Sequence, residues 1–295
     1  MAAAQTRTDG SAKFRRFSWY RVRRNGAKVV WYVGLILLGS LFSLPFFWMI
    51  SSSLKVEARI WIYPPKWLPN PVLWENYPEA LRLMHFGQLL QNTAFLTGVG
   101  TLAVVLSSSW IVYGFARLDF PGKNVIFTIL LATMMLPGQV TMVPRFIMFK
   151  ELHWLNTYLP LLVPALFGDA FYIFLLRQFY MGIPTELDDA ARIDGCNYVG
   201  IWWRILLPLA KPALATVTVF SIIRGWNDFL WPLIILNDSE KFNLALGLAT
   251  FRGLYHTQWA YLMAASVVIL LPTIILYFFA QRFIVEGIAL TGLKG

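Results

Sequence analysis

The chain of 295 residues has little charge, one cysteine and three histidines. Charged residues make up 14% of it, where soluble domains carry about a quarter. A single cysteine excludes a disulfide within the chain, and so few histidines and cysteines disfavour a metal cluster. No stretch fits G-x-x-x-x-G-K-[S/T], the loop with which many ATPases hold phosphate. We therefore expect no metal, no cofactor and no catalytic site on this chain.

The chain is rich in hydrophobic residues, which make up 58% of it, and its mean hydropathy is +0.58. A helix that crosses a hydrocarbon core of about 30 Å needs about 20 apolar residues. The runs that lack Lys, Arg, Asp and Glu are 29–54, 86–116, 124–144 and 253–281. Two more runs are interrupted, 154–176 by Asp169 and 212–237 by Arg224 and Asp228. The sequence predicts an all-α membrane protein with six transmembrane helices.

The distribution of basic residues predicts the orientation, because cytoplasmic segments retain Lys and Arg. With the N-terminus inside, 16 basic residues fall in inner segments and 8 in outer ones. We therefore expect both termini in the cytoplasm of a bacterial or archaeal plasma (inner) membrane. The predicted division is a basic segment 1–28, a six-span domain 29–283 and a tail 284–295. The net charge of +10 is assigned to membrane lipid rather than nucleic acid, because basic and aromatic residues flank the first span.

Between the predicted fourth and fifth spans lies a patterned cytoplasmic loop, about residues 181–211. Thr185 and Asp188 fit a capping box, and the acids that follow Pro184 favour a helix start. Gly195 is suited to end that helix, because a helix often ends in a left-handed residue. A second amphipathic stretch, 198–207, precedes Pro208 and the return to the membrane.

This loop resembles the cytoplasmic loop of the permease subunits of binding-protein-dependent ABC importers. Their pattern is E-A-A, three residues, G, nine residues, then I-x-L-P. The matching residues here are Asp189, Ala190, Ala191, Gly195, Ile205, Leu207 and Pro208, with Asp189 one methylene shorter than the usual Glu. The segments WNDFLWPL (226–233) and QRFIVEGIALTGLKG (281–295) are similar to those of the carbohydrate, maltose-type branch.

The resemblance implies a type I ABC importer fold in which the loop is a coupling helix that docks on a separate ATPase. The residues expected at that contact are Glu186, Asp189, Ala190, Ala191, Asp194, Gly195, Ile205, Leu207 and Pro208. The implied partners are a sister permease, two ATPase subunits that hold ATP and Mg²⁺, and an extracytoplasmic sugar-binding protein. Oligosaccharides, monosaccharides and polyols or glycerol phosphate stay open as substrates. A loop helix that lies on lipid is disfavoured, because its acids would face anionic headgroups.

Charged groups inside predicted spans are costly and face protein or water. Arg224 and Asp228 are four residues apart, so on one helix they would share a face and neutralise each other. Alternatively they line a sugar path, for which the candidates are Arg224, Trp226, Asn227, Asp228, Trp231 and Asp169. Helical spacing does not put all of the residues from 224 to 231 on one face, so only some of them can line it.

Two other classes of protein compete with an importer subunit. An ion-coupled secondary transporter often has inverted repeats and several buried carboxylates, which the sequence lacks. A membrane-embedded enzyme needs a nucleophile, base or metal set clustered near one interface, and no such cluster is evident.

Overall fold

The computed structural model describes residues 10–253 and 257–292, with side chains for 28–253 and 257–281. In this part the chain is helical, and its single β-bridge, between Arg252 and Thr257, lies outside any strand. The all-α fold class is thereby confirmed.

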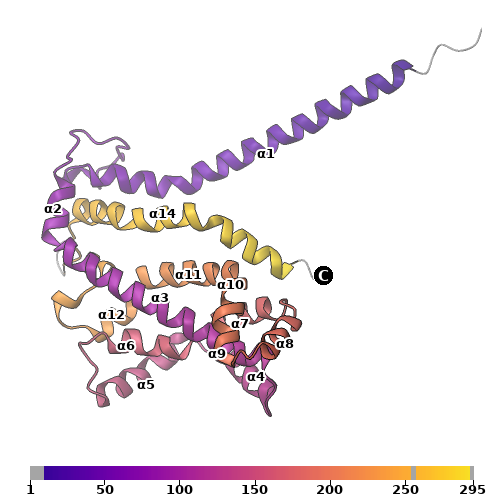
Figure 1. Ribbon diagram of the computed structural model, residues 1–295. Coiled ribbons are helices and arrows are strands. Elements are labelled where there is room, and N and C mark those ends of the chain that lie inside the picture. The colour runs from indigo at the N-terminus through magenta and orange to yellow at the C-terminus, as the bar shows by residue number, and fades with distance from the viewer. Residues whose placement is uncertain (1–9, 254–256, 293–295) are drawn as a thin grey trace, which may run out of the picture.

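Long helices that pack one on the next form the body of the molecule (Figure 1). α1 (Gly10–Ser53) packs along α14 (Trp259–Gly292), and α14 packs on α11 (Lys211–Trp226). α11 in turn packs on α3 (Phe86–Arg117), whose next neighbour is α7 (Ala170–Tyr180). α1 and α14 run through the predicted boundaries at residues 28 and 283, so the division of the chain there stays a prediction.

Shorter helices fill the two ends of this body. The α-helices are α2 (Asn76–Leu83), α4 (Lys123–Thr133), α5 (Gly138–Glu151), α6 (Leu159–Leu162), α8 (Glu186–Ile193), α9 (Tyr198–Ile201), α10 (Leu207–Leu209), α12 (Leu230–Ile235) and α13 (Leu244–Ala249). The 3₁₀ turns are η1 (Glu57–Arg59), η2 (Val163–Phe167) and η4 (Ser239–Lys241), and η3 (Trp202–Leu206) is a π-helical turn. The two ends of the molecule are called the α2 end and the α8 end below.

Four helical segments are long and apolar enough to cross a membrane: Lys28–Ser53, Phe86–Arg117, Leu159–Tyr180 and Trp259–Gln281. Two further helix pairs are broken, α4 with α5 at 99° and Tyr198–Leu209 with α11 at 82°. The described residues therefore give four spans, or up to six if each bent pair is one span, and the count of six stays a prediction. Pro137 precedes α5 and lacks the N–H that a continuous helix would use, which accounts for the first break.

The segment predicted as a fifth span, 212–237, is not one helix. α11 ends at Trp226, residues 227–229 break the helix, and the short α12 follows. This break matters for the site, because it separates two charged residues that the sequence placed on one helical face.

Helix α3 is common to the hydrophobic cores of both ends. At the α8 end its Val112 and Tyr113 pack in one cluster with Tyr180 of α7. At the α2 end its Leu89 packs with Leu244 of α13 and with residues of α2 and α14. Helix α3 therefore contributes packed side chains to the core at both ends.

The loop between α1 and α2 packs at the α2 end and contacts the start of α14. Asn76 donates hydrogen bonds to the carbonyls of Ser53 (2.8 Å) and Lys55 (3.0 Å). The carboxylate of Glu57 accepts from the backbone N–H groups of Trp259 (3.0 Å) and Ala260 (2.8 Å), and thus caps the start of α14. Lys55 is buried, which lowers the pKa of its ammonium, and its Nζ donates to the Lys66 carbonyl at 2.6 Å.

Candidate functional site

A cavity of about 340 Å³ lies among α3, α5, α6, η2, α11 and α12. Its charged lining residues are Arg145, Asp169, Arg224 and Asp228. Charged side chains inside a bundle of apolar helices are costly, so this cavity is the candidate functional site.

One ion pair crosses this cavity, from Arg224 of α11 to Asp169 at the start of α7. Nη1 of Arg224 lies 2.9 Å from Oδ2 of Asp169. The other carboxylate oxygen of Asp169 caps α7, because Oδ1 accepts from the N–H groups of Phe171 (3.0 Å) and Tyr172 (3.4 Å). Gly168 has a φ of +78°, which turns the chain into this cap. The Arg224 side chain is 71% exposed, so the pair faces the open cavity.

The predicted pairing of Arg224 with Asp228 is therefore wrong. A spacing of four residues places two side chains on one face only while the helix continues, and α11 ends at Trp226. Asp228 lies in the break that follows, where its backbone carbonyl accepts from Nδ2 of Asn243 at 2.5 Å. Its side chain still lines the cavity.

The structure also divides the other predicted path residues. Trp231 lines the cavity, as do Asp169, Arg224 and Asp228. Trp226 instead packs toward α14, where its Nε1 donates to the Ile269 carbonyl at 3.1 Å. Asn227 donates to the carbonyl of Ile223 at 2.7 Å and is not among the cavity-lining residues.

Arg145, just beyond the predicted apolar run 124–144, also lines the cavity and was not among the predicted path residues. Its guanidinium carbon lies 4.2 Å from the ring centroid of Trp231, within the range of a cation–π contact. Phe149, one turn further along α5, meets the same indole edge-on at 6.3 Å. The basic residue with an aromatic residue four positions later was a pattern that could have placed Arg145 on a helix facing the protein interior.

Hydroxyl groups complete the cavity wall on α3. Thr93, Thr97 and Thr101 recur every four residues and all line the cavity, as does Ser221 of α11. Thr101 and Ser221 are hydrogen-bonded at 3.0 Å between their side-chain oxygens. This spacing of threonines within an apolar helix was visible in the sequence and predicts a polar stripe along one face.

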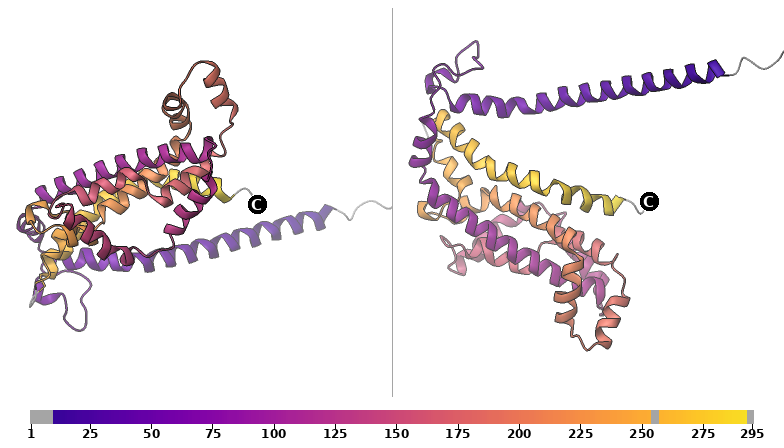
Figure 2. Two further views of the ribbon diagram at one scale, coloured as in Figure 1. Left: turned by 90° about the horizontal axis from the view of Figure 1, so that it is seen from below. Right: turned by 45° about the horizontal axis from the view of Figure 1, so that its top comes forward.

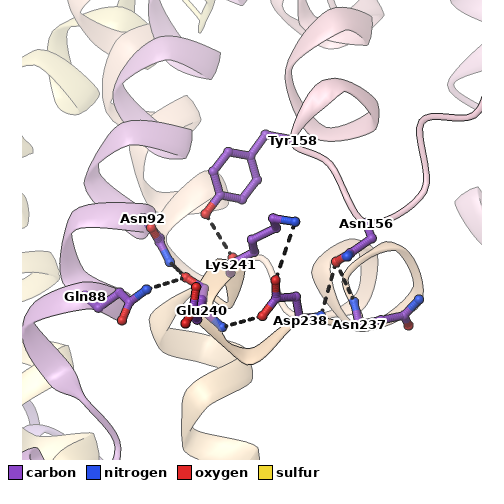
Figure 3. A network of polar contacts seen from close by, with 8 residues as sticks. All are labelled: Gln88, Asn92, Asn156, Tyr158, Asn237, Asp238, Glu240 and Lys241. Carbon is purple, nitrogen blue, oxygen red and sulfur yellow. Dashed lines mark hydrogen bonds and ion pairs between the residues drawn. The ribbon is translucent and has the colours of Figure 1, made fainter.

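A polar network holds the loop between α12 and α13 at the α2 end, beside the cavity (Figure 3). Two side chains of α3, Gln88 (2.9 Å) and Asn92 (2.7 Å), donate to the carbonyl of Glu240. Tyr158 donates to the carbonyl of Lys241 at 3.1 Å, and the side-chain oxygen of Asn156 accepts from the N–H groups of residues 237 and 238. Side chains of α3 and of the 156–158 turn thus position this loop chiefly through its main chain.

At the opposite end, the loop that carries α8 projects from the helical bundle (Figure 2). α8 ends at Ile193, and Gly195 follows with a φ of +81°, so the predicted left-handed helix end is confirmed. Six of the predicted docking residues are exposed: Glu186, Asp189, Ala190, Asp194, Gly195 and Pro208. Ile205 and Leu207 are half-buried, and Ala191 is buried. Ile193, which the prediction omitted, is 87% exposed.

The predicted capping box is absent from α8. Thr185 makes no side-chain cap hydrogen bond, and Asp188 points inward instead. Oδ2 of Asp188 lies 3.2 Å from Nε of Arg117, the last residue of α3, and the two side chains are 5% and 2% exposed. Burial raises the pKa of the Asp188 carboxyl, and the charges of Arg117 and Arg192 oppose this rise. Asp188, which the local sequence predicted in the helix cap, instead forms this buried ion pair.

Apolar helices, a charged cavity among them and an exposed acidic loop define a multi-pass membrane transport protein. The family model described as "Binding-protein-dependent transport system inner membrane component" matches residues 111–289. The chain belongs to this family and is a transport subunit of the plasma membrane. The family resemblance is confirmed, and the ion-gradient transporter and membrane-enzyme interpretations are set aside.

Relatives share much of the chain. It is 38% identical over 204 residues to the arabinooligosaccharides transport system permease protein AraQ of Halalkalibacterium halodurans, covering 69% of this chain and 73% of the relative. It is 31% identical over 276 residues to the sn-glycerol-3-phosphate transport system permease protein UgpE of Yersinia pestis, covering 90% and 97%. Among solved structures, a chain of a bacterial ABC transporter for import of the acidic polysaccharide alginate superposes with a TM-score of 0.75 at 25% identity, covering 87% of this chain and 97% of that one.

Proposed function

We propose that this chain is one of two permease subunits of an ABC importer for a carbohydrate or a related polyol. The observation that carries the proposal is the cavity of charged and hydroxyl groups that α3 and α11 line. The relatives named above transport arabinooligosaccharides and glycerol 3-phosphate, which supports a polyhydroxylated substrate.

The cavity supplies the groups that such a substrate needs. Sugar hydroxyls both donate and accept, so a wall with guanidinium donors, carboxylate acceptors and threonine hydroxyls offers partners of both kinds. The positive charges of Arg145 and Arg224 are matched in number by the negative charges of Asp169 and Asp228. This balance suits a substrate held through hydroxyl groups. The substrate path thus comprises Arg145, Asp169, Arg224, Asp228 and Trp231.

The α8 loop is the docking element for a separate ATPase. Its exposed face carries acids together with Ile193, and an exposed apolar side chain at the tip of a charged helix is typical of a contact with another protein. Glu186, Asp189 and Asp194 would meet basic side chains of the partner. ATP and Mg²⁺ belong to the ATPase subunits, since this chain has no phosphate-binding loop motif.

The arrangement of the ends supports the orientation. In Figure 1 the α8 loop, the C-terminal part of α14 and the N-terminal part of α1 lie at the same end of the molecule. If α8 meets a cytoplasmic ATPase, both termini are cytoplasmic, which agrees with the distribution of basic residues. The α2 end then faces outward, toward the sugar-binding protein.

Transport would proceed by alternating access. Closure of the ATPase dimer on ATP would move α8, and the permease pair would open its cavity outward to receive sugar from the binding protein. Hydrolysis would release the dimer and return the cavity to the inside.

The proposal is tested by purifying the tagged chain from its native membrane in mild detergent. We expect an ATPase and a second permease of similar size to co-purify, and the membrane to lose uptake of one sugar or polyol when the gene is deleted. A chain that purifies alone, or whose loss leaves uptake of a broad panel of sugars and polyols unchanged, would contradict the proposal.

A further inference from the structure

Helix α8 is fixed to the rest of the protein by a narrow inner face. Asp188 and Ala191, one turn apart, are its buried residues, whereas Glu186, Asp189 and Arg192 are exposed. Ala191 joins the hydrophobic cluster at the α8 end, and Asp188 pairs with Arg117. A force applied to the exposed face of α8 therefore reaches the body of the protein through very few contacts.

The ion pair among these contacts is an unusual choice for stability alone. Removing two charges from water is costly, and a buried pair recovers that cost only when its remaining hydrogen bonds are satisfied. Oδ1 of Asp188 accepts no hydrogen bond from any residue that the structure describes. An apolar pair of similar volume would serve a purely structural purpose at least as well.

Arg117 joins α8 to the longest helix of the cavity wall. Its Nη2 also donates to the carbonyl of Ile183, just before α8, at 2.9 Å. Arg117 ends α3, a helix of 32 residues that carries the cavity-lining threonines Thr97 and Thr101. A displacement of Arg117 along α3 therefore reaches the cavity without passing through any loop.

Two covalent routes also lead from α8 to the cavity. One runs back through residues 181–185 to α7, whose Tyr172 lines the cavity. The other, toward α11, runs through Gly195 and the segment Tyr198–Leu209, which meets α11 at an angle of 82°. A bend of this size between two helices absorbs displacement as a change of angle. The noncovalent route through Arg117 has no such bend.

We infer that Arg117 and Asp188 form a joint through which movement of α8 drives α3, and with it one wall of the transport cavity. The inference rests on the proposed docking of α8 to an ATPase. Both are positioning residues, since neither lines the cavity and neither lies on the exposed docking face.

The test uses the complete transporter in liposomes: this chain, its sister permease, the ATPase subunits and the binding protein. Asp188→Asn removes one charge with little change of shape, and Arg117→Gln removes the other charge while it leaves a shorter polar side chain. Glu79→Gln, in the exposed pair with Arg82 at the α2 end, is the control for loss of an ion pair elsewhere. We expect the joint variants to keep their ATPase subunits while sugar uptake per ATP hydrolysed falls about tenfold, and the control to match the parent.

Movement of α3 is the readout that a merely structural role would leave unchanged. In a Cys196→Ser background, spin labels at Leu102→Cys of α3 and Ile275→Cys of α14, both on exposed side chains, report the distance between these helices. We expect ATP to change this distance in the parent and to leave it unchanged in Asp188→Asn. If α3 does not move in the parent, or moves equally in the variant, the inference is overturned.

A double variant guards against a failure to fold. Arg117→Met with Asp188→Leu removes both buried charges together, which maintains a buried contact without an uncompensated charge. We expect this variant to assemble and to transport poorly, and normal uptake would overturn the inference. Failure of the underlying proposal is distinct: in that case no ATPase accompanies the parent, or Asp189→Lys on the exposed face leaves its association unchanged.

Discussion

Asp169 serves two elements at once, because one of its carboxylate oxygens caps α7 and the other pairs with Arg224 across the cavity at 2.9 Å. Asn retains an acceptor for the helix cap but lacks the charge, whereas Ala retains neither. We predict that Asp169→Asn leaves thermal stability near that of the parent and reduces uptake. Asp169→Ala should lose both uptake and about 1 kcal/mol of stability with the cap. Unfolding midpoints in detergent and uptake in liposomes, measured on the same preparations, separate the two roles, and normal uptake by the Asn variant would refute the role of the pair.

Trp231 is predicted to act chiefly by holding Arg145, since the guanidinium occupies a face of the indole at 4.2 Å. Trp231→Phe should retain most uptake because a phenyl ring still attracts the cation, and Trp231→Leu should lose more. A cation–π contact of this kind contributes about 0.5 to 2 kcal/mol. The check is the substrate concentration for half-maximal uptake in the two variants. Equal values for Phe and Leu would contradict this role.

Gly195 is predicted to be required for its backbone conformation. Within this chain there is room for a side chain, so only the partner could exclude one. Its φ is +81°, and an added Cβ would meet nothing within 4 Å inside this chain. Asn tolerates the left-handed region, whereas Val does so at a cost of about 1 to 2 kcal/mol or more. Gly195→Asn should therefore retain ATPase association better than Gly195→Val, measured by co-purification. Equal loss in both would mean that the partner contact leaves no room for any side chain.

Glu57 ties the α2 end together by capping α14 from the distant loop after α1. Glu57→Gln retains an acceptor, so we expect a small decrease in stability, whereas Glu57→Ala leaves the first N–H groups of α14 without their cap. The expected loss for Ala is about 1 kcal/mol, measured as the unfolding midpoint in detergent. A midpoint for Ala equal to that of the parent would show that the cap contributes nothing.

Most of the fold could be predicted from apolar runs, and the α8 loop from its local pattern. Both are local properties, since a run of apolar residues or a glycine after a short helix has the same meaning wherever it occurs. The errors concern partners. The sequence suggested partners close by in the chain, Asp228 for Arg224 and the Thr185 cap for Asp188. In the structure Arg224 pairs with Asp169 and Asp188 with Arg117, each from another helix.

The reason for these errors is physical. A charge within a bundle pairs with whichever opposite charge the packing brings near, and helix ends decide which side chains share a face. The sequence predicted neither the end of α11 at Trp226 nor the continuation of α5 past Arg145. The threonine stripe on α3 could have been found, because its spacing of four is evident in the sequence alone.

This permease is proposed to be driven through the exposed face of α8. The most direct measurement is the rate of ATP hydrolysis by the reconstituted transporter, with and without sugar-loaded binding protein, for Asp189→Lys compared with the parent. Glu79→Lys, at the opposite end, is the control. We expect loaded binding protein to stimulate hydrolysis in the parent and in the control. We expect Asp189→Lys to abolish this stimulation and uptake while the two permeases stay paired. Stimulation and uptake at parental levels in Asp189→Lys would contradict a driving role for the exposed face of α8.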